Sequence, residues 1–245
     1  MAYTFKHIEH RVYQNTFLKD VRIAVEFPKI AAADVDVPSL QAYFSKFSNA
    51  NIKADDFLER GFINIFSGNH QIDFKFSLSY AEAKLCTPPY TSFKDAESFW
   101  TILMDFLDAM GIAVVNRLVV RKYNALYFKT NTPDYDIREV MGGLFCDELM
   151  RHVNAQVGKD KSLNSFERTW SMSDSDSGSE VNVVYGIKKA DATEGRDCLT
   201  LVTLVKSTAP PISVTDVMKR AREYNQILFD VFHWCVREDI INNMK

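Results

Sequence analysis

The sequence predicts an α+β protein built from two sheet-and-helix halves, and three observations lead to this class. Apolar and polar residues alternate in several short stretches, as they do in half-buried strands. Two longer stretches repeat their apolar residues at helical spacing, one on each side of a polar, proline-containing break at 130–136. The 245 residues are 47% hydrophobic and 25% charged, which is enough for a packed core without disulfides or metals.

The first half begins with a β-rich stretch at 20–27, which Pro28 ends. A helix is predicted at 37–47, because its apolar residues recur at helical spacing and proline suits a first turn. The alternating residues of 61–85 predict a hairpin of two strands, with its turn at Ser67–Asn69.

A second helix is predicted between a capping box at Ser92 and Asp95 and a stop at Gly111. A long β-rich segment at 112–129 follows it. The order βαββαβ predicts a ferredoxin-like arrangement for a domain at residues 1–130.

The second half, residues 131–245, is predicted to form a short helix, a three-stranded antiparallel sheet and a long C-terminal helix. The expected strands are 165–173, 180–189 and 198–207, and the long helix begins at Ser213. Its apolar face widens from Leu228 onward, which predicts a covering by the sheet or by another chain. Whether the two halves are independent domains or share one sheet is left open.

The stretch SMSDSDSGSEVNVVYG at 171–186 has the spacing of acidic residues found in calcium loops. Counting from Asp174, however, Gly178 takes a ligand position and Tyr185 the place of the closing glutamate. Because β-like residues flank it on both sides, we interpret the stretch as a hairpin with a solvated tip.

The composition limits which cellular compartment and which class of binding partner are expected. The net charge of −3 excludes a strong overall attraction to nucleic acid or acidic lipid. The four cysteines are scattered singly, which favours reduced thiols. No signal peptide and no membrane-spanning apolar run is recognised, so we expect a cytoplasmic protein without membrane contact.

No motif in the chain indicates a catalytic residue, a cofactor site or a metal site. Glycine-rich phosphate loops, nucleophile elbows and zinc patterns are all missing from the sequence. His7 and His10 are three residues apart but are interpreted as surface residues, and His233 as a core or interface histidine.

The long strand carries the best candidate for a binding face. Arg117 and Arg121 are an even number of residues apart on this strand, so both side chains should emerge on the same face. There they could clamp carboxylates or phosphates. Suitable pairing would add lysines to this patch, namely Lys75, Lys84 or Lys122. In the alternative interpretation the arginines form cross-strand ion pairs with acids such as Asp73 or Glu82.

The same strand resembles a known family. RLVVRKYN at 117–124 is similar to the R-x-x-x-R-x-x-N strand of a sporadically distributed prokaryotic family of unknown function. The segments 15–30, 88–100 and 224–240 resemble other parts of that family, the last of them its N-x-I-x(4)-F helix. The resemblance implies a cytoplasmic prokaryotic protein, adds Asn124 to Arg117 and Arg121 as family-like positions, and implies no activity.

Three functions are compatible with the sequence. The leading hypothesis is a non-enzymatic protein-binding or assembly module, acting on a protein partner or on a second copy. The first alternative is a nucleic-acid-binding accessory protein that uses the arginine-bearing sheet face. The second is an enzyme without a recognisable motif.

Overall fold

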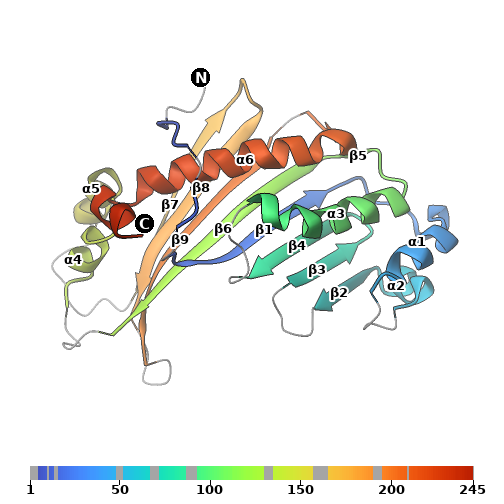
Figure 1. The fold of residues 1–245 in the computed structure, drawn as a ribbon, viewed down its shortest axis with the longest axis horizontal. Coiled ribbons are helices and arrows are strands. Elements are labelled where there is room, and N and C mark those ends of the chain that lie inside the picture. The colour runs from blue at the N-terminus through green and yellow to red at the C-terminus, as the bar shows by residue number, and fades with distance from the viewer. Residues whose placement is uncertain are drawn as a thin grey trace.

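A computed structural model of the protein describes most of the chain, namely residues 5–9, 11–13, 16–47, 52–66, 72–86, 93–129, 135–156, 165–189, 195–208 and 210–244. These residues form a mixed α+β fold around a large antiparallel sheet, with helices packed against it (Figure 1). The predicted α+β class is therefore confirmed.

The elements of the first half follow one another as a strand, a pair of short helices, three strands and a long helix. They are β1 (Leu18–Glu26), a 3-10 turn (Ala32–Asp34), α1 (Val37–Phe44), α2 (Ala54–Arg60), β2 (Phe62–Phe66), β3 (Ile72–Ser77), β4 (Tyr80–Cys86) and α3 (Phe93–Ala109).

The elements from residue 114 onward repeat this order and add two short strands and a short last helix. From here on they are called the second half, although the predicted boundary at residue 130 leaves the strand at 117–128 in the first. The elements of the second half are β5 (Val114–Val115), β6 (Arg117–Phe128), α4 (Ile137–Gly142), α5 (Asp147–Gln156), β7 (Ser165–Asp174), β8 (Ser179–Lys188), β9 (Asp197–Ser207), β10 (Ile212–Ser213), α6 (Val214–Cys235) and α7 (Glu238–Asn243).

One sheet runs through both halves. Its eight strands have the order β2-β3-β4-β1-β6-β9-β8-β7, and each neighbouring pair is antiparallel. The three-stranded sheet predicted for residues 131–245 is not confirmed as a sheet of its own, because β9 pairs with β6, so that β7, β8 and β9 form one side of the eight-stranded sheet. Whether residue 130 bounds a domain stays a prediction.

The ferredoxin-like arrangement of the first half is not confirmed, because the segment 72–85 is two strands and not one. The chain turns at Leu78–Ser79, whose carbonyl oxygens accept hydrogen bonds of 3.0 Å from Ile30 N and Phe27 N. The alternation of apolar residues runs on through this turn, and no glycine or proline marks it. The turn predicted at Ser67–Asn69 and the helix start at Ser92 lie outside the described residues.

The two halves are arranged symmetrically in the sheet. Apart from the short strands β5 and β10, each half places its first strand at the centre, β1 beside β6. From the centre outward follow the last, the middle and the first of its other three strands. Since β1 and β6 are antiparallel, an approximate two-fold axis between them relates the two sets of strands. The long helices α3 and α6 follow the last strand of each set and contact each other.

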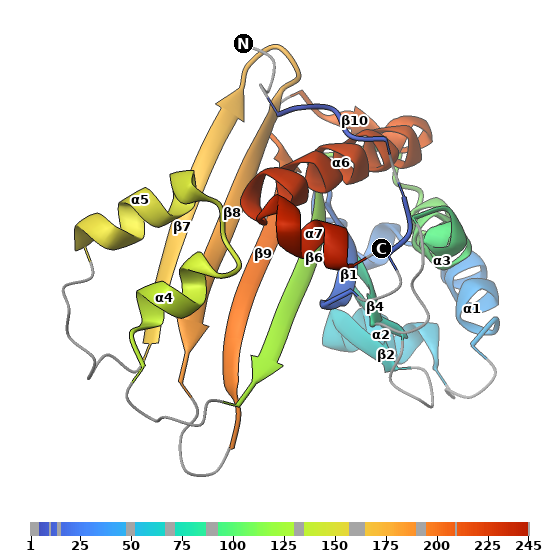
Figure 2. The ribbon, with the colours of Figure 1, turned by 60° about the vertical axis from the view of Figure 1, so that its left-hand side comes forward.

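The core lies between the sheet and the helices. In the first half it is rich in aromatic rings: Phe76 and Phe106 stack at 4.3 Å, and Tyr43 contacts both. In the second half α6 packs on β6 and β9, and Figure 2 shows the helix crossing these strands. The α4–α5 region reaches the same face through Phe145, whose ring meets that of Tyr185 on β8.

The stretch at 171–186 is a hairpin, as predicted. Strands β7 and β8 pair along their whole length, and a four-residue turn at 175–178 joins them. The side chain of Asp174 accepts a hydrogen bond from Asp176 N at 3.0 Å, which is the local role that aspartate plays in turns.

Candidate functional site

The strands at the centre of the sheet separate its two faces clearly. On β1, Val21, Ile23 and Val25 are fully buried against the helices. The residues between them point to the opposite face, which we call the open face. The described contacts of Phe106 with Phe76, Phe145 with Tyr185 and Phe229 with Lys122 place helices on the other face. The alternation follows from the two-residue period of a strand.

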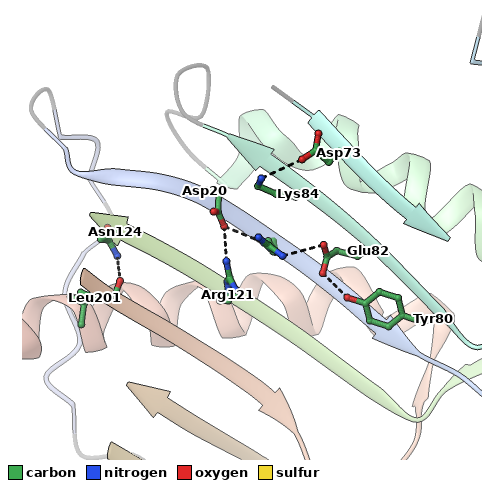
Figure 3. Close-up of polar contacts among 9 residues, drawn as sticks. Asp20, Asp73, Tyr80, Glu82, Lys84, Arg121, Asn124 and Leu201 are labelled. Carbon is green, nitrogen blue, oxygen red and sulfur yellow. Dashed lines mark hydrogen bonds and ion pairs between the residues drawn. The ribbon is translucent and has the colours of Figure 1, made fainter. Parts of the chain in front are cut away.

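Two arginines meet at the centre of the open face. The register of β1 and β6 places Arg22 directly opposite Arg121, close to the approximate two-fold axis. Like charges in this position repel each other. Asp20 compensates them both, because its Oδ1 accepts from Arg22 Nε at 3.3 Å and from Arg121 Nη2 at 3.2 Å (Figure 3).

A second carboxylate extends the network onto β4. Arg22 Nη1 lies 3.4 Å from Glu82 Oε1, and the Tyr80 hydroxyl donates to Glu82 Oε2 at 2.5 Å. Burial raises the pKa of Tyr80, and the hydrogen bond to Glu82 raises it further, so this hydroxyl stays protonated. Only 7% of Glu82 is exposed, which makes the network a partly buried structure.

Further ion pairs stand on either side of this network. Lys84 Nζ lies 3.2 Å from Asp73 Oδ2 on β3, and Arg117 Nη1 lies 3.2 Å from Glu26 Oε1 on β1. Arg117 and Arg121 thus form cross-strand ion pairs, as the alternative interpretation predicted, although with Glu26 and Asp20 and not with Asp73 or Glu82.

The third family-like position does not share this face. Asn124 differs from Arg121 in parity and is 3% exposed, and its Nδ2 donates to Leu201 O at 3.2 Å (Figure 3). Its side chain therefore holds β6 to β9. Of the three candidate residues, the structure places Arg117 and Arg121 on the open face and Asn124 on the buried face.

Lys122 is also on the buried side, so it does not extend the basic patch. It lies between the sheet and α6 with its Nζ 6.0 Å from the centre of the Phe229 ring. Burial lowers the pKa of Lys122 to about 7, since a low-dielectric surrounding disfavours the charged amine. Lys84, by contrast, lies on the open face with Asp73.

The half of the open face over β6, β9 and β8 is more apolar. The register aligns Tyr123 with Val202 and Val184 in one row and Arg121 with Leu204 in the next. These side chains are partly exposed. The open face therefore combines a compensated charged centre with an apolar flank.

The long C-terminal helix has its extra apolar surface covered by its own chain. Tyr13 stacks on Phe229 at 6.2 Å, and its hydroxyl hydrogen-bonds His233 Nε2 at 2.6 Å. Phe17 packs on Phe232, and Asp230 accepts from Ile8 N at 2.9 Å. We call the described residues of this segment, 5–9, 11–13, 16 and 17, the N-terminal arm. It contacts the widened apolar part of α6 in addition to the sheet, which was one of the two expected coverings.

Chemistry beyond binding has few candidates in the described residues. A hollow of about 490 Å³ between α1 and the end of α3 is lined by Asp34, Asp36, Asp105 and Asp108, and one of about 380 Å³ lies between the β7–β8 turn and α6. Neither touches the arginine network. Within the described ranges no three acidic, histidine or cysteine side chains are grouped to hold a metal ion.

Sequence reasoning missed Asp20 and Arg22 at the centre of the network, and it named Glu82 only as a partner of Arg117 or Arg121 and not of Arg22. A signal for the first two was present, since the strand DVRIAVEF alternates Asp20 and Arg22 with three apolar residues. Their closeness to Arg121 depends on the pairing of β1 with β6, which spans about 100 residues of sequence and is invisible in any local pattern.

Comparison with known proteins does not assign a function to this face. In the part of the chain that the structure describes, no helix is both long and apolar enough to cross a membrane. No protein-family model matches the chain, and no curated protein matches it either. The resemblance to a prokaryotic family of unknown function therefore stays a prediction.

Proposed function

We propose that the protein is a non-enzymatic protein-binding module that receives a protein partner on the open face of its sheet. The observation that carries this proposal is the one-sided arrangement of the fold. The helix contacts described above lie on one face of the sheet, and partly exposed Tyr123, Val202 and Leu204 lie on the other. An antiparallel sheet can face water on one side, but such a side is normally polar.

The size of the open face fits a protein partner. Eight strands about 4.8 Å apart span roughly 34 Å, and strands of 5 to 12 residues are roughly 17–40 Å long. The face is thus on the order of 1,000 Å², close to the roughly 800 Å² that each partner contributes to a stable interface. An apolar flank beside a polar, hydrogen-bonded centre also matches the mixed composition of such interfaces.

The electrostatics favour a protein over a nucleic acid. Arg117 and Arg121 are each held by a carboxylate, so a phosphate would have to displace Glu26 or Asp20. Salt-sensitive binding of nucleic acid comes from uncompensated basic charge. Nucleic-acid binding by this face is the second candidate, and the experiment below separates the two.

The test is affinity capture from the native host at low salt, with three forms of the protein and with nuclease in half of the samples. Val202→Lys places a charge in the apolar flank of the open face. Thr101→Lys, on the exposed side of α3, makes the same chemical change on the helical side of the molecule. Captured proteins are quantified by mass spectrometry.

We expect a protein that is captured by the wild type and by Thr101→Lys, resists nuclease, and is lost with Val202→Lys. Loss of the captured material after nuclease treatment would favour the nucleic-acid candidate. Capture that Val202→Lys leaves unchanged would contradict the role of the open face.

A further inference from the structure

The edge strand β2 has a sequence that reads the same in both directions, Phe62–Ile63–Asn64–Ile65–Phe66. It is the last strand of the sheet on the side of the first half, so no strand of the described chain pairs with its outer edge. An antiparallel strand pair formed by two copies of one sequence has a two-fold axis at its centre. A palindromic edge strand is therefore complementary to itself.

From this geometry we propose that β2 is a self-association site, where two copies of the chain pair antiparallel about Asn64 and join their sheets. In this register Phe62 lies opposite Phe66 of the second copy, Ile63 opposite Ile65, and Asn64 opposite Asn64. Shifting the register by two residues would set Phe62 against Asn64 and lose both aromatic pairs. The palindrome thus specifies a single register.

The faces of the two copies match in this pairing. Phe62 and Phe66 belong to the open face and are 58% and 53% exposed, whereas Ile65 is buried toward the helices. Because paired residues have the same parity, the aromatic pairs form on the open side and the isoleucine pairs continue the core. Phenylalanine pairs across strands are among the stabilising ones.

Among the described residues, helix α2 packs over the sheet and not along the edge of β2. Its Phe57 ring packs inward, 5.5 Å from that of Phe44 and 6.1 Å from that of Phe106. Gly61, at a φ of 74°, then turns the chain from the helix into the strand. The helix therefore lies over the sheet and not beyond its edge.

The opposite edge of the sheet has a different composition. Strand β7 carries Glu167, Arg168 and Asp174 among serines and a threonine, and its sequence is not palindromic. Charges and polar residues are what natural sheets place on edges that must not associate. Strand β2 has no charged residue, and an uncharged, β-branched and aromatic edge is a pairing site unless it is protected.

The inference is tested by sedimentation equilibrium of the full chain over a range of concentrations. We expect a monomer of 28.1 kDa in equilibrium with a dimer of twice that mass. Asn64→Lys sets two like charges face to face on the axis and should raise the dissociation constant at least about tenfold. Thr169→Lys, at an exposed position of β7, is the matched control and should leave it unchanged.

A cross-linking pair locates the contact independently. Opposite residues of an antiparallel pair have Cα atoms about 4.5–5.5 Å apart, which suits a disulfide. Asn64→Cys should therefore give a disulfide-linked dimer on mild oxidation. Lys75→Cys, one strand inward, would place its two thiols about three strand spacings apart, roughly 14 Å, and should not.

A chain that is monomeric at all concentrations would overturn the inference. So would a dimer that Asn64→Lys does not weaken and Asn64→Cys does not cross-link. The centre of the open face takes no part in this contact. The result of this test is therefore independent of the proposed function.

Discussion

At the scale of single residues, the most consequential side chain is Asp20, because it holds two arginines at once. Asp20 is 6% exposed and lies within 3.3 Å of both guanidinium groups. Replacing one member of a buried charged network leaves the others uncompensated, which costs more than the interaction itself contributes.

We expect Asp20→Asn to lower the free energy of unfolding by about 2–4 kcal/mol, since Arg22 and Arg121 then repel each other. Glu26→Gln removes the exposed ion pair to Arg117 and should cost no more than about 1 kcal/mol. Urea denaturation followed by circular dichroism measures both values. Equal losses in the two variants would contradict the central role of Asp20.

Lys122 should make stability depend on pH in a defined direction. Its pKa is about 7 in the folded chain and 10.5 ordinarily, so between these values the unfolded chain binds more protons. Stability therefore rises as the pH increases from 7 to 10.5, and the full cost of burying the charge is present below pH 7.

Lys122→Met removes this cost, which the lowering of the Lys122 pKa from 10.5 to about 7 puts on the order of a few kcal/mol. We expect the variant to be more stable than the wild type at pH 7 and below, with the difference shrinking toward pH 10.5. Denaturation at pH 6, 8 and 10 tests this. A difference that does not change with pH would show that Lys122 is not desolvated.

At the scale of elements, the strands with a clear alternation are those that the sequence predicts best. The predicted strands at 165–173, 180–189 and 198–207 correspond to β7, β8 and β9. The single strand predicted across Leu78–Ser79 is wrong, because the turn there is held by hydrogen bonds from Phe27 and Ile30, far away in sequence. A local pattern carries no trace of such distant partners.

The same reasoning explains which parts of the candidate site were predicted. The parity of a strand was enough to put Arg117 and Arg121 on one face. Because Asn124 is an odd number of residues from Arg121, the same alternation puts it on the opposite face. Only the family resemblance had grouped Asn124 with the two arginines. The acids that pair with the arginines depend on the register of β1 against β6, which only the folded chain reveals.

The N-terminal arm gives a prediction for one element. Tyr13 contributes both a ring stacked on Phe229 and a hydrogen bond to His233. We expect Tyr13→Ala to cost about 2 kcal/mol and to speed amide hydrogen exchange in the second half of α6. Val12→Ala, at a side chain that is 58% exposed, should change neither. Unchanged exchange in Tyr13→Ala would contradict a covering role of the arm.

At the scale of the whole molecule, the shared sheet predicts one cooperative unfolding transition. The central β1–β6 pair and the contacts of α3 with α6 join the two halves. Trp100 reports on the first half, and Trp170 and Trp234 on the second. In variants that keep only one of these groups, fluorescence should give the same urea midpoint. Two separate midpoints would show that the halves unfold as independent domains.

The order of strands also has a consequence for synthesis on the ribosome. β1 can pair with β4 once residue 86 has emerged from the ribosome. The other edge of β1 stays unpaired until β6 is complete at residue 128. At translation rates of 5–20 residues per second, these roughly 40 residues take about 2–8 s. For that time the nascent chain presents a bare strand edge that its own continuation will later occupy.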